Sequence, residues 1–513
     1  MVSHNTSGRS TPAQAFRLAS VGLAVALISA LFVARPNAGS ADDDGNESSG
    51  RLTFAKPVFV TEGIDRQAAE PSIRVDANDP TQRIWITAPS GIVPNSRSLA
   101  EGNSGDLLWY SDNNGKTWHP KSGPAGIGSP TIAGGGDSDV ATGFGPEVFQ
   151  TGLTLVNATL AASCDRGETF SSNPIGDIGT IQDRQWIDTW EDHAKPALGP
   201  DLLLNYGEFA TERIWLHQVV APCDVNGQPA TQPQGGPPID VTHPGCVDVV
   251  TPDPGCYQWP GNLALDERTG DVYVTYNTVG DPTHDDVIVS RVDQAGSRVA
   301  TAADVHTFVA AGNRPDTFDS FTVVAVDRSS NVYVVWNERH PGRDATDVML
   351  AFSRNRGETW SKPIRVNRAA GAHTTTFPWI VAGRKGKIDI VYYGTSASGK
   401  SPETVPNSAK WRVWMAQSLN VLSGDPDFTE VPATGYMHKG SICTSGTGCA
   451  AGTRDLLDFF QIDVDRQGLA NIAYTDNLNT PPDPGDPMDA TDDDPHQEWV
   501  TFVQQNGGKG IYG

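Results

Sequence analysis

The sequence contains three copies of one eight-residue segment, and this repetition constrains the fold more than any other feature. The copies span residues 111–118, 163–170 and 353–360 and share the pattern Ser-x-[Asp/Asn]-x-Gly-x-Thr-[Trp/Phe]. An Asp or Asn side chain can accept hydrogen bonds from backbone N–H groups two residues on, and Gly supplies the positive φ of a tight turn. Each copy follows a short apolar strand. The pattern therefore predicts a repeated strand–turn–strand unit closed by an aromatic side chain.

The three segments resemble the Asp box of sialidases and other β-propellers. The resemblance implies a structural role for all three boxes, on the face away from the ligand site. The box residues expected to form the turns are Asp112, Gly115, Trp118, Asp165, Gly167, Phe170, Asn355, Gly357 and Trp360.

A longer repeat surrounds the boxes. Two apolar strands joined by a turn recur along the chain, as in residues 263–276 and 324–336, and a third strand follows each pair. We count seven such units, and repeated groups of four short strands predict a β-propeller. We expect an all-β fold over residues 52–513 with seven four-stranded blades. Six blades is the alternative, if the loosely matching unit near residue 139 is an insertion.

The two ends of this region share a pattern. Residues 56–60 (Lys-Pro-Val-Phe-Val) match residues 362–366 (Lys-Pro-Ile-Arg-Val), which follow the third box. The last unit has only three strands of its own. We therefore expect the N-terminal strand to supply the outer strand of the last blade, which would leave no exposed gap in the ring.

The N-terminus has the features of an export signal. Arg9 and Arg17 come before an apolar run over residues 18–34, and small residues at 39–41 come before Asp42. We expect residues 1–41 to be a cleaved signal peptide, with a retained membrane anchor as the alternative, and residues 42–51 to be a linker. The protein is then secreted or extracellular, and anchored at the cell surface if the segment is retained.

The chain is strongly acidic, with a formal net charge of −24 over 513 residues. Such a charge repels nucleic acid and anionic membranes, so we expect no nucleic-acid partner and membrane contact only through an uncleaved N-terminal segment. It also disfavours an anionic substrate such as a sialoside. We expect a monomer whose partner is a glycan or a surface protein.

The six cysteines form an even set, which favours disulfides in an exported chain. The expected pairs are Cys443–Cys449, Cys246–Cys256 and Cys164–Cys223. Their spacings match no zinc site, so no metal site and no cofactor are expected. Calcium is the alternative, because carboxylates are plentiful near the expected ligand face.

In propellers, ligand pockets gather side chains from several blades where the innermost strands begin. The candidate catalytic residues near these positions are Glu70, Asp183, Arg184, Arg314, Asp319, Arg454 and Asp458. The candidate ligand-binding residues are Tyr257, Trp259 and His373.

The resemblance to sialidases implies an arginine triad that holds the substrate carboxylate. The position of the first family arginine, before the first inner strand, is occupied by Ala69. Arg184, Arg314 and Arg454 could replace the triad, or each could pair with a nearby acid, among them Asp183, Asp316 and Asp455. Two of the carboxylates could also act as the acid and base of glycoside hydrolysis.

Two functions remain open from the sequence. One is an exported glycan- or protein-recognition module built on a sialidase-like propeller. The other is an exo-sialidase or related glycoside hydrolase that uses carboxylates and arginines at the propeller mouth. The missing family arginine favours the first, and the acid-rich mouth keeps the second open. The sequence contains no phosphate-binding Gly loop and no Gly-x-Ser-x-Gly nucleophile elbow.

Overall fold

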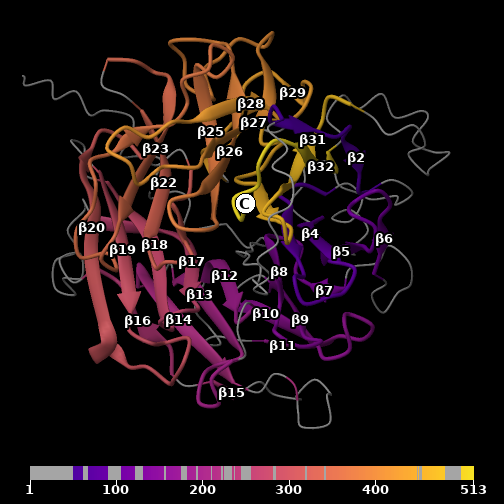
Figure 1. Ribbon diagram of the computed structural model, residues 1–513, viewed down its shortest axis with the longest axis vertical. Coiled ribbons are helices and arrows are strands. Elements are labelled where there is room, and N and C mark those ends of the chain that lie inside the picture. Colours follow the sequence, from indigo (N-terminus) through magenta and orange to yellow (C-terminus); the bar gives the residue numbers. More distant parts are fainter. Residues whose placement is uncertain are drawn as a thin grey trace, which may run out of the picture.

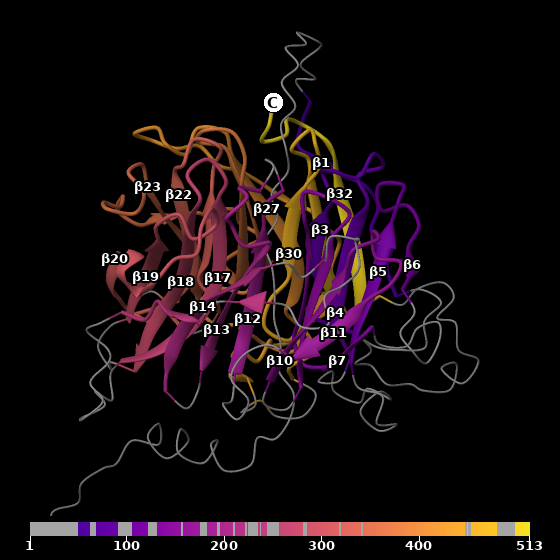
Figure 2. The same cartoon turned by 90° about the horizontal axis from the view of Figure 1, so that it is seen from below.

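The protein forms a ring of seven antiparallel sheets (Figure 1). A computed structural model describes residues 50–513 apart from the segments 62–67, 91–104, 122–130, 155–156, 175–181, 192–194, 209–210, 221–222, 224–233, 236, 244–255, 281–284, 318–319, 340–341, 447–448, 450–452 and 480–497. The expected signal peptide and nearly all of the linker lie outside the described residues. Seen from the side, the strands run roughly along the ring axis (Figure 2).

The first part of the chain forms blades 1 to 3. Blade 1 consists of β3 (Ser72–Val75), β4 (Ile84–Pro89), β5 (Gly105–Ser111), β6 (His119–Pro120) and β7 (Ile132–Ala133). Blade 2 consists of β8 (Ser138–Thr142), β9 (Val148–Thr154), β10 (Asn157–Ser163) and β11 (Ser171–Pro174). Blade 3 consists of β12 (Gln182–Thr189), β13 (Leu202–Glu208), β14 (Arg213–Val220), β15 (Gln234–Gly235) and β16 (Ile239–Asp240).

Blades 4 to 6 continue the ring. Blade 4 consists of β17 (Cys256–Asp266), β18 (Asp271–Gly280), β19 (Asp285–Val292) and β20 (Val305–Arg314), the last preceded by the short 3-10 helix η3 (Ala302–Asp304). Blade 5 consists of β21 (Val323–Val326), β22 (Val332–Arg339), β23 (Thr346–Ser353) and β24 (Ile364–Arg365). Blade 6 consists of β25 (Thr374–Ala382), β26 (Ile388–Thr395), β27 (Lys410–Ser418), β28 (Thr429–Pro432) and β29 (His438–Lys439).

Blade 7 joins the two ends of the chain. It consists of β30 (Gln461–Val464), β31 (Ala470–Asp476), β32 (Trp499–Gly507), β1 (Thr53–Phe54) and β2 (Val58–Phe59). Both N-terminal strands pair with β32, with Phe54 opposite Gln505 and Val58 opposite Phe502. The predicted seven-bladed fold and its closure by the N-terminal strand are confirmed. The loosely matching unit near residue 139 is a blade rather than an insertion.

The first strand of each blade lies at the centre of the ring and contacts the first strands of both neighbours. Polar side chains on these inner strands hold the blades together. Asp188 in β12 accepts a hydrogen bond from the backbone N–H of Leu265 at 2.6 Å, and Asn262 in β17 accepts one from Val324 at 2.7 Å. Each such bond satisfies an inner-strand N–H that has no ladder partner on that side. The inner ring is therefore a closed, fixed frame.

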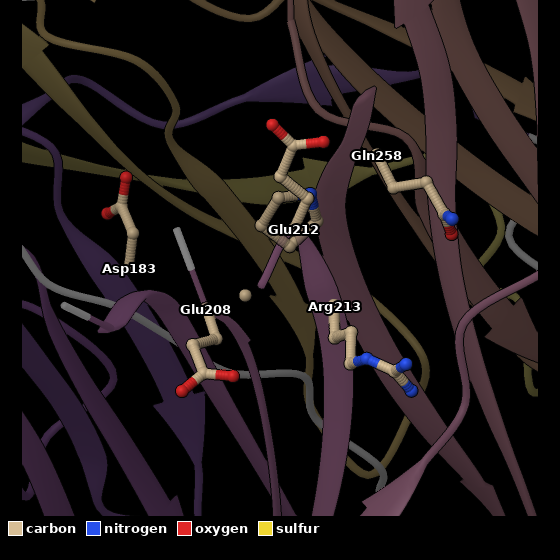
Figure 3. Close-up of a pocket in the computed structure, with 7 residues that line it drawn as sticks. Asp183, Glu208, Glu212, Arg213 and Gln258 are labelled. Atoms are coloured by element: carbon tan, nitrogen blue, oxygen red, sulfur yellow. The ribbon is translucent and has the colours of Figure 1, made fainter. Parts of the chain in front are cut away.

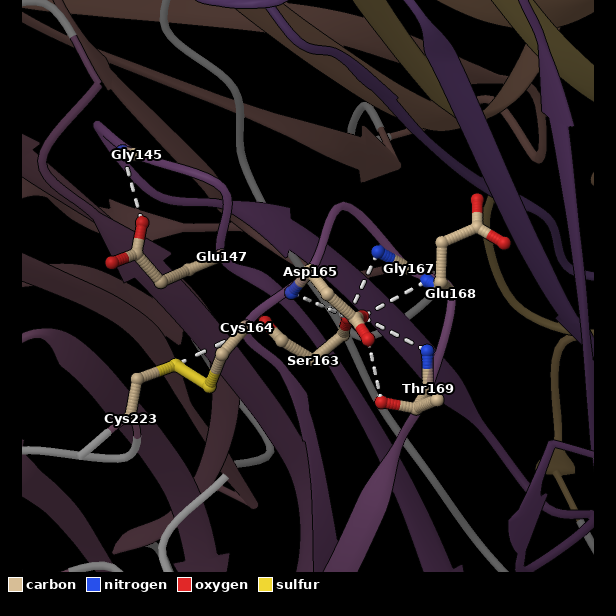
Figure 4. Close-up of a disulfide and its surroundings, with 9 residues drawn as sticks. All are labelled: Gly145, Glu147, Ser163, Cys164, Asp165, Gly167, Glu168, Thr169 and Cys223. Atoms are coloured by element: carbon tan, nitrogen blue, oxygen red, sulfur yellow. Dashed lines mark hydrogen bonds between the residues drawn. A yellow bond between two sulfur atoms is a disulfide. The ribbon is translucent and has the colours of Figure 1, made fainter. Parts of the chain in front are cut away.

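The second Asp box shows how these turns are held (Figure 4). The Asp165 carboxylate accepts hydrogen bonds from the backbone N–H groups of Glu168 at 3.1 Å and Thr169 at 2.9 Å. The Ser163 hydroxyl donates to Asp165 at 2.7 Å and accepts from the Gly167 N–H at 2.8 Å. The turn is therefore stabilised by side chains of the box itself.

In the first box, the side chain that holds the turn is Asn113, which corrects the assignment to Asp112. Asn113 accepts a hydrogen bond from the backbone N–H of Thr117 at 3.0 Å, as the third residue of the pattern does in the other boxes. Asp112 is the variable second residue, and it forms an ion pair with Arg83 at 2.6 Å.

The boxes also pack against the preceding blade. Gly115 has a φ of +71°, and a Cβ added there would lie 2.0 Å from the ring of Phe502 in blade 7. The ring of Trp118 packs against the same Phe502, with centroids 5.2 Å apart. In the second box, a Cβ on Gly167 would lie 2.3 Å from the ring of Trp85 in blade 1. Glycine is required at both positions by conformation and by space.

Two of the predicted disulfides are present. Cys164–Cys223 joins the second Asp box in blade 2 to the segment that follows β14 in blade 3 (Figure 4). Cys443–Cys449 closes a short loop between blades 6 and 7. The predicted Cys246–Cys256 pair includes Cys246, which lies outside the described residues. Within the described part of the chain, no helix is long and apolar enough to cross a membrane.

Candidate functional site

The inner strands all begin at one face of the ring, which we call the mouth. Because successive strands of a blade are antiparallel, the third strand of each blade ends at the opposite face. The three Asp boxes follow third strands β5, β10 and β23, so they lie away from the mouth. The topology therefore places the boxes on the face that the family resemblance implies.

Side chains from four blades meet at the mouth in a group that we call the central charged cluster: Glu70, Asp137, Asp183, Arg184, Arg454 and Asp458. Arg184 lies in the middle. Its guanidinium is 3.1 Å from a Glu70 oxygen, 3.3 Å from Asp137 and 3.7 Å from Asp183, and it also pairs with Asp458. Arg454 shares the Asp458 carboxylate. Arg184 is only 3% exposed, so the cluster is an internal ion-pair network.

Irregular backbone at the start of the inner strands directs these side chains. Glu70 and Arg184 have φ values of 58° and 56°, and Phe377 in blade 6 has a φ of 55°. The strand register shifts at the same place in β12, between Asp183 and Trp186, and in β25, between Thr376 and Trp379. A bulge re-aims a side chain, and left-handed backbone at residues other than glycine is concentrated at functional or strained sites.

Aromatic rings from four blades fill the space next to the charged cluster. Trp186 packs against Phe321, Trp379 and Phe459 at centroid distances of 5.6, 5.2 and 5.4 Å. The guanidinium carbon of Arg184 lies 4.3 Å from the centroid of the Phe321 ring. All four rings are buried. The cluster is thus supported by a packed hydrophobic layer rather than by an open channel at this level.

Burial sets the protonation behaviour of the cluster. It raises the pKa of Glu70 to about 7 and that of Asp183 to about 6, against the lowering effect of Arg184 in both cases. Burial acts in the same direction on Asp458, but the guanidinium groups of Arg454 and Arg184 hold its pKa below the ordinary value. Asp458 is therefore the carboxylate that stays charged between the two arginines, and Glu70 and Asp183 carry protons more readily.

The three candidate arginines do not form a triad. Arg184 and Arg454 meet at Asp458, whereas Arg314 at the end of β20 forms a two-pronged pair with Glu338 of β22, at 2.7 and 2.6 Å. The neighbouring acids differ from those expected for two of the arginines. Asp316 lies 3.4 Å from Arg339, and Asp455 accepts a hydrogen bond from Asn477 at 2.8 Å.

The other predicted site residues are spread around the mouth. Ala69, at the position of the family arginine, is buried against Leu457. Trp259 is half-buried and lies parallel to Phe321 with centroids 6.0 Å apart. His373 is exposed, and its backbone N–H bonds to Thr395 at 2.8 Å. For Tyr257 only the backbone is described, in β17 opposite Val279. Asp319 lies outside the described residues.

A small hollow at the mouth lies between blades 3 and 4, and we call it the blade 3–4 hollow. It is lined by Asp183, Gly207, Glu208, Glu212, Arg213, Gln258 and Pro260. The three acidic side chains lie on one side of it in Figure 3, and Arg213 and Gln258 lie on the other. Asp183 belongs both to this hollow and to the central charged cluster. Asp183 therefore connects the hollow with the buried network.

Sequence reasoning missed Asp137, Glu208, Glu212 and Gln258. Asp137 stands directly before inner strand β8, much as Glu70 stands two residues before β3, so its position was the signal that could have found it. Glu208 ends a second strand and carries no such signal. Its carboxylate accepts a hydrogen bond from the indole N–H of Trp215 at 3.1 Å. Among the described residues, no group of three or more His, Cys, Asp or Glu side chains could hold a metal ion.

The chain is similar to one repeat family over a short segment and to several solved structures at low sequence identity. Residues 109–120 match the family model described as BNR/Asp-box repeat. A protein of unknown function from Dyadobacter fermentans is similar in structure over 89% of this chain and 99% of its own, at 12% identity and a TM-score of 0.42. An α-L-arabinanase from Penicillium chrysogenum, complexed with arabinobiose, is similar over 88% and 98%, at 12% identity and a TM-score of 0.42.

The NanB sialidase from Streptococcus pneumoniae is similar over 89% of this chain and 70% of its own, at 10% identity and a TM-score of 0.37. No curated protein matches the chain in sequence. The chain folds as a seven-bladed β-propeller with three Asp-box turns, the first of which the family model matches.

Proposed function

We propose that this protein is an exported recognition propeller that binds a neutral glycan at its mouth and does not hydrolyse sialosides. The observation that carries the proposal is the occupation of all three candidate arginines by carboxylates of the protein itself. Arg184 and Arg454 are bound within the central charged cluster, and Arg314 is bound by Glu338.

The energies favour the protein's own pairs over an anionic ligand. Breaking a buried ion pair costs about 3–5 kcal/mol, because the remaining charge stays desolvated. A new charge-assisted hydrogen bond to a ligand carboxylate returns only about 1.5–3 kcal/mol. A sialoside carboxylate would also approach a chain with a net charge of −24. The arginines therefore act as internal counter-ions rather than as a carboxylate clamp.

The blade 3–4 hollow offers the groups that bind a neutral sugar. Carboxylate oxygens of Glu208 and Glu212 and the amide of Gln258 can pair with sugar hydroxyl groups. Trp215 beside Glu208 is only partly buried, so its ring can contribute apolar surface. A few polar groups next to an aromatic ring are typical of small-molecule sites.

A specific observation keeps glycoside hydrolysis as the second candidate. A general acid must hold a proton near neutral pH, and burial raises the pKa of Asp183 to about 6. Asp183 also lines the hollow, whereas Glu70 is completely buried against Arg184. If the protein is a hydrolase, Asp183 is the residue that we expect to donate the proton.

The test is calorimetric titration of the purified chain with neutral pentose- and hexose-based oligosaccharides and with sialyllactose. We expect binding of a neutral oligosaccharide, weakened at least tenfold by Glu212→Gln and by Gln258→Ala. Glu358→Gln is the matched control, because Glu358 is an exposed glutamate on the box face. Binding of sialyllactose alone would contradict the proposal.

Product release from the same oligosaccharides separates the two candidates. The recognition proposal predicts no products. Release that is abolished by Asp183→Asn, with oligosaccharide binding retained, would replace recognition by hydrolysis.

A further inference from the structure

An exposed tyrosine at the mouth end of blade 6 is flanked by cations. Lys410 and Arg412 begin β27, Tyr436 precedes β29, and Lys439 ends β29; we call these four residues the blade 6 patch. Strands β27 and β29 lie near the top of the ring in Figure 1. Tyr436 is 43% exposed, the Arg412 guanidinium carbon lies 4.0 Å from its ring centroid, and the Lys410 nitrogen lies 5.1 Å from it.

The positive charges of the patch are not balanced by the described residues. Lys410 and Lys439 are cross-strand partners in the β27–β29 pair, and like charges in that position destabilise a sheet. Within the described part of the chain, Lys410, Arg412 and Lys439 form no ion pair. This is unusual in a chain with 61 acidic and only 37 Lys and Arg residues. The Arg412 side chain does donate to the backbone carbonyl of Thr434 at 3.2 Å.

Acidic residues elsewhere in blade 6 have other partners. Glu430 accepts hydrogen bonds from the Tyr392 hydroxyl at 2.8 Å and from the backbone N–H of Arg368. Glu403 accepts from the Ser445 hydroxyl at 2.7 Å. The hydrogen bond from Arg412 and the neighbouring positive charges lower the pKa of Tyr436, which reflects the local excess of positive charge. The patch thus has no counter-ion among the described residues and displays an aromatic ring.

We propose that the blade 6 patch binds an anionic saccharide. The ring of Tyr436 packs against the sugar, and Arg412, Lys410 and Lys439 bind its carboxylate or sulfate oxygens. A guanidinium suits a planar or tetrahedral anion, because it presents several N–H donors in a fixed geometry. The overall negative charge of the protein does not prevent this, since exposed charges are screened beyond roughly 8 Å at physiological ionic strength.

This site is separate from the blade 3–4 hollow and goes beyond the proposed function. The hollow offers carboxylates and an amide, and it suits neutral hydroxyl groups. The blade 6 patch offers cations on the same face of the ring. Substitutions at one site should leave binding at the other unchanged, so that failure of one proposal can be told apart from failure of the other.

The experiment is calorimetric titration of the full chain with a glucuronate-containing hexasaccharide and with its carboxyl-reduced neutral form. We expect at least tenfold weaker binding of the reduced form, and weaker binding of the acidic form at higher salt. Tyr436→Ala and Arg412→Gln should each weaken binding of the acidic form at least fivefold. Lys385→Gln is the charge-matched control, because Lys385 is an exposed lysine at the opposite end of the same blade. Glu212→Gln should leave this titration unchanged.

Equal affinity for the acidic and reduced forms would overturn the proposal, and so would an equal loss in Lys385→Gln. A chain in which the aspartates of residues 483–494 are changed to asparagine tests another occupant. Tenfold tighter binding by that chain would show that the patch serves its own acidic segment, and the proposal would be wrong. Unchanged binding by that chain would support it.

Discussion

The Asp-box turns and the central charged cluster are both networks of polar side chains, but they differ in span and in burial. In the second box, the Asp165 carboxylate binds Thr169, four residues away, in an exposed turn. In the cluster, Arg184 binds Glu70 and Asp458, which are 114 and 274 residues away, in the interior. A lost box side chain leaves N–H groups that water can reach. A lost cluster side chain leaves a buried charge without its partner.

This difference indicates how the two faces divide their tasks. On the box face, local turns pack blades 1, 2 and 5 against the preceding blades. The mouth fixes several blades at once through the ion pairs of Arg184 and Arg454. Substitutions on each face test this division, and their expected effects on stability differ in size.

Replacement of Arg184 by Met should have the largest effect. It removes the central cation from Glu70, Asp137, Asp183 and Asp458, and loss of one partner from a buried ion pair costs about 3–5 kcal/mol. Chemical denaturation measures the free energy of unfolding. The matched change Arg298→Met, which removes a more exposed pair with Asp304, should cost far less. Equal losses would mean that the cluster is not the centre of stability at the mouth.

The pH dependence of stability should come next in size. Burial raises the pKa of Glu70 in the folded state to about 7, above its ordinary value of 4.5. The folded protein therefore binds the Glu70 proton more tightly than the unfolded chain does. The stability that this proton contributes is complete below about pH 4 and is lost as the pH rises to about 7. Between pH 4 and 8, wild type should lose roughly 3 kcal/mol relative to Glu70→Gln.

The measurement is the free energy of unfolding of both proteins across that pH range. Parallel curves for wild type and Glu70→Gln would contradict the assigned shift. A steeper loss of stability in Glu70→Gln than in wild type would mean that the Glu70 pKa is lowered rather than raised.

On the box face, glycine substitutions should rank by the space around them. Gly115→Ala places a methyl group 2.0 Å from the Phe502 ring at a φ of +71°, and we expect a loss of roughly 2–3 kcal/mol. Gly357→Ala meets the nearest atom of Phe308 at 3.1 Å, so only the backbone strain, about 1 kcal/mol, should remain. Melting temperatures of the two variants check the order. A larger loss in Gly357→Ala would show that the blade contact is unimportant.

The smallest expected effect distinguishes two adjacent residues of the first box. Asn113→Ala removes the acceptor of the Thr117 N–H and should cost about 1 kcal/mol. Asp112→Ala removes only a surface pair with Arg83 and should cost less than about 1 kcal/mol. Neither change should alter ligand affinity, because the boxes lie away from the mouth. The reverse order by urea denaturation would restore Asp112 as the turn residue.

The sequence predicted the fold well because its determinants are local. The Asp boxes are held within eight residues, and the inner-strand pattern repeats in every blade, so both can be recognised without a structure. The pairing of residues 52–60 with the last blade could be predicted because that segment repeats the pattern of residues 362–366. The assignment to Asp112 failed because Asp112 and Asn113 are neighbours of similar chemistry, and only the geometry separates them.

The site was predicted only in part because its contacts are distant in the chain. Arg184, Arg454, Glu70 and Asp458 were found from their position before inner strands, and the structure brings them together. Their partners could not be predicted, since any of several carboxylates was near enough in sequence. Arg314 was wrongly expected in the central site. It ends β20, which is an outer strand and does not lead into the centre of the ring.

The central claim is that Arg184, Arg314 and Arg454 are already occupied by carboxylates of the protein and cannot hold a ligand carboxylate. Calorimetric titration of the purified chain with N-acetylneuraminic acid, combined with turnover of a fluorogenic sialoside, tests it most directly. At neutral pH we predict no turnover and no binding heat that depends on Arg184 or Arg454; any heat from the blade 6 patch should persist when either of these two arginines is replaced. Binding or turnover that is lost in Arg184→Met or Arg454→Met, in protein that remains folded, would contradict the claim.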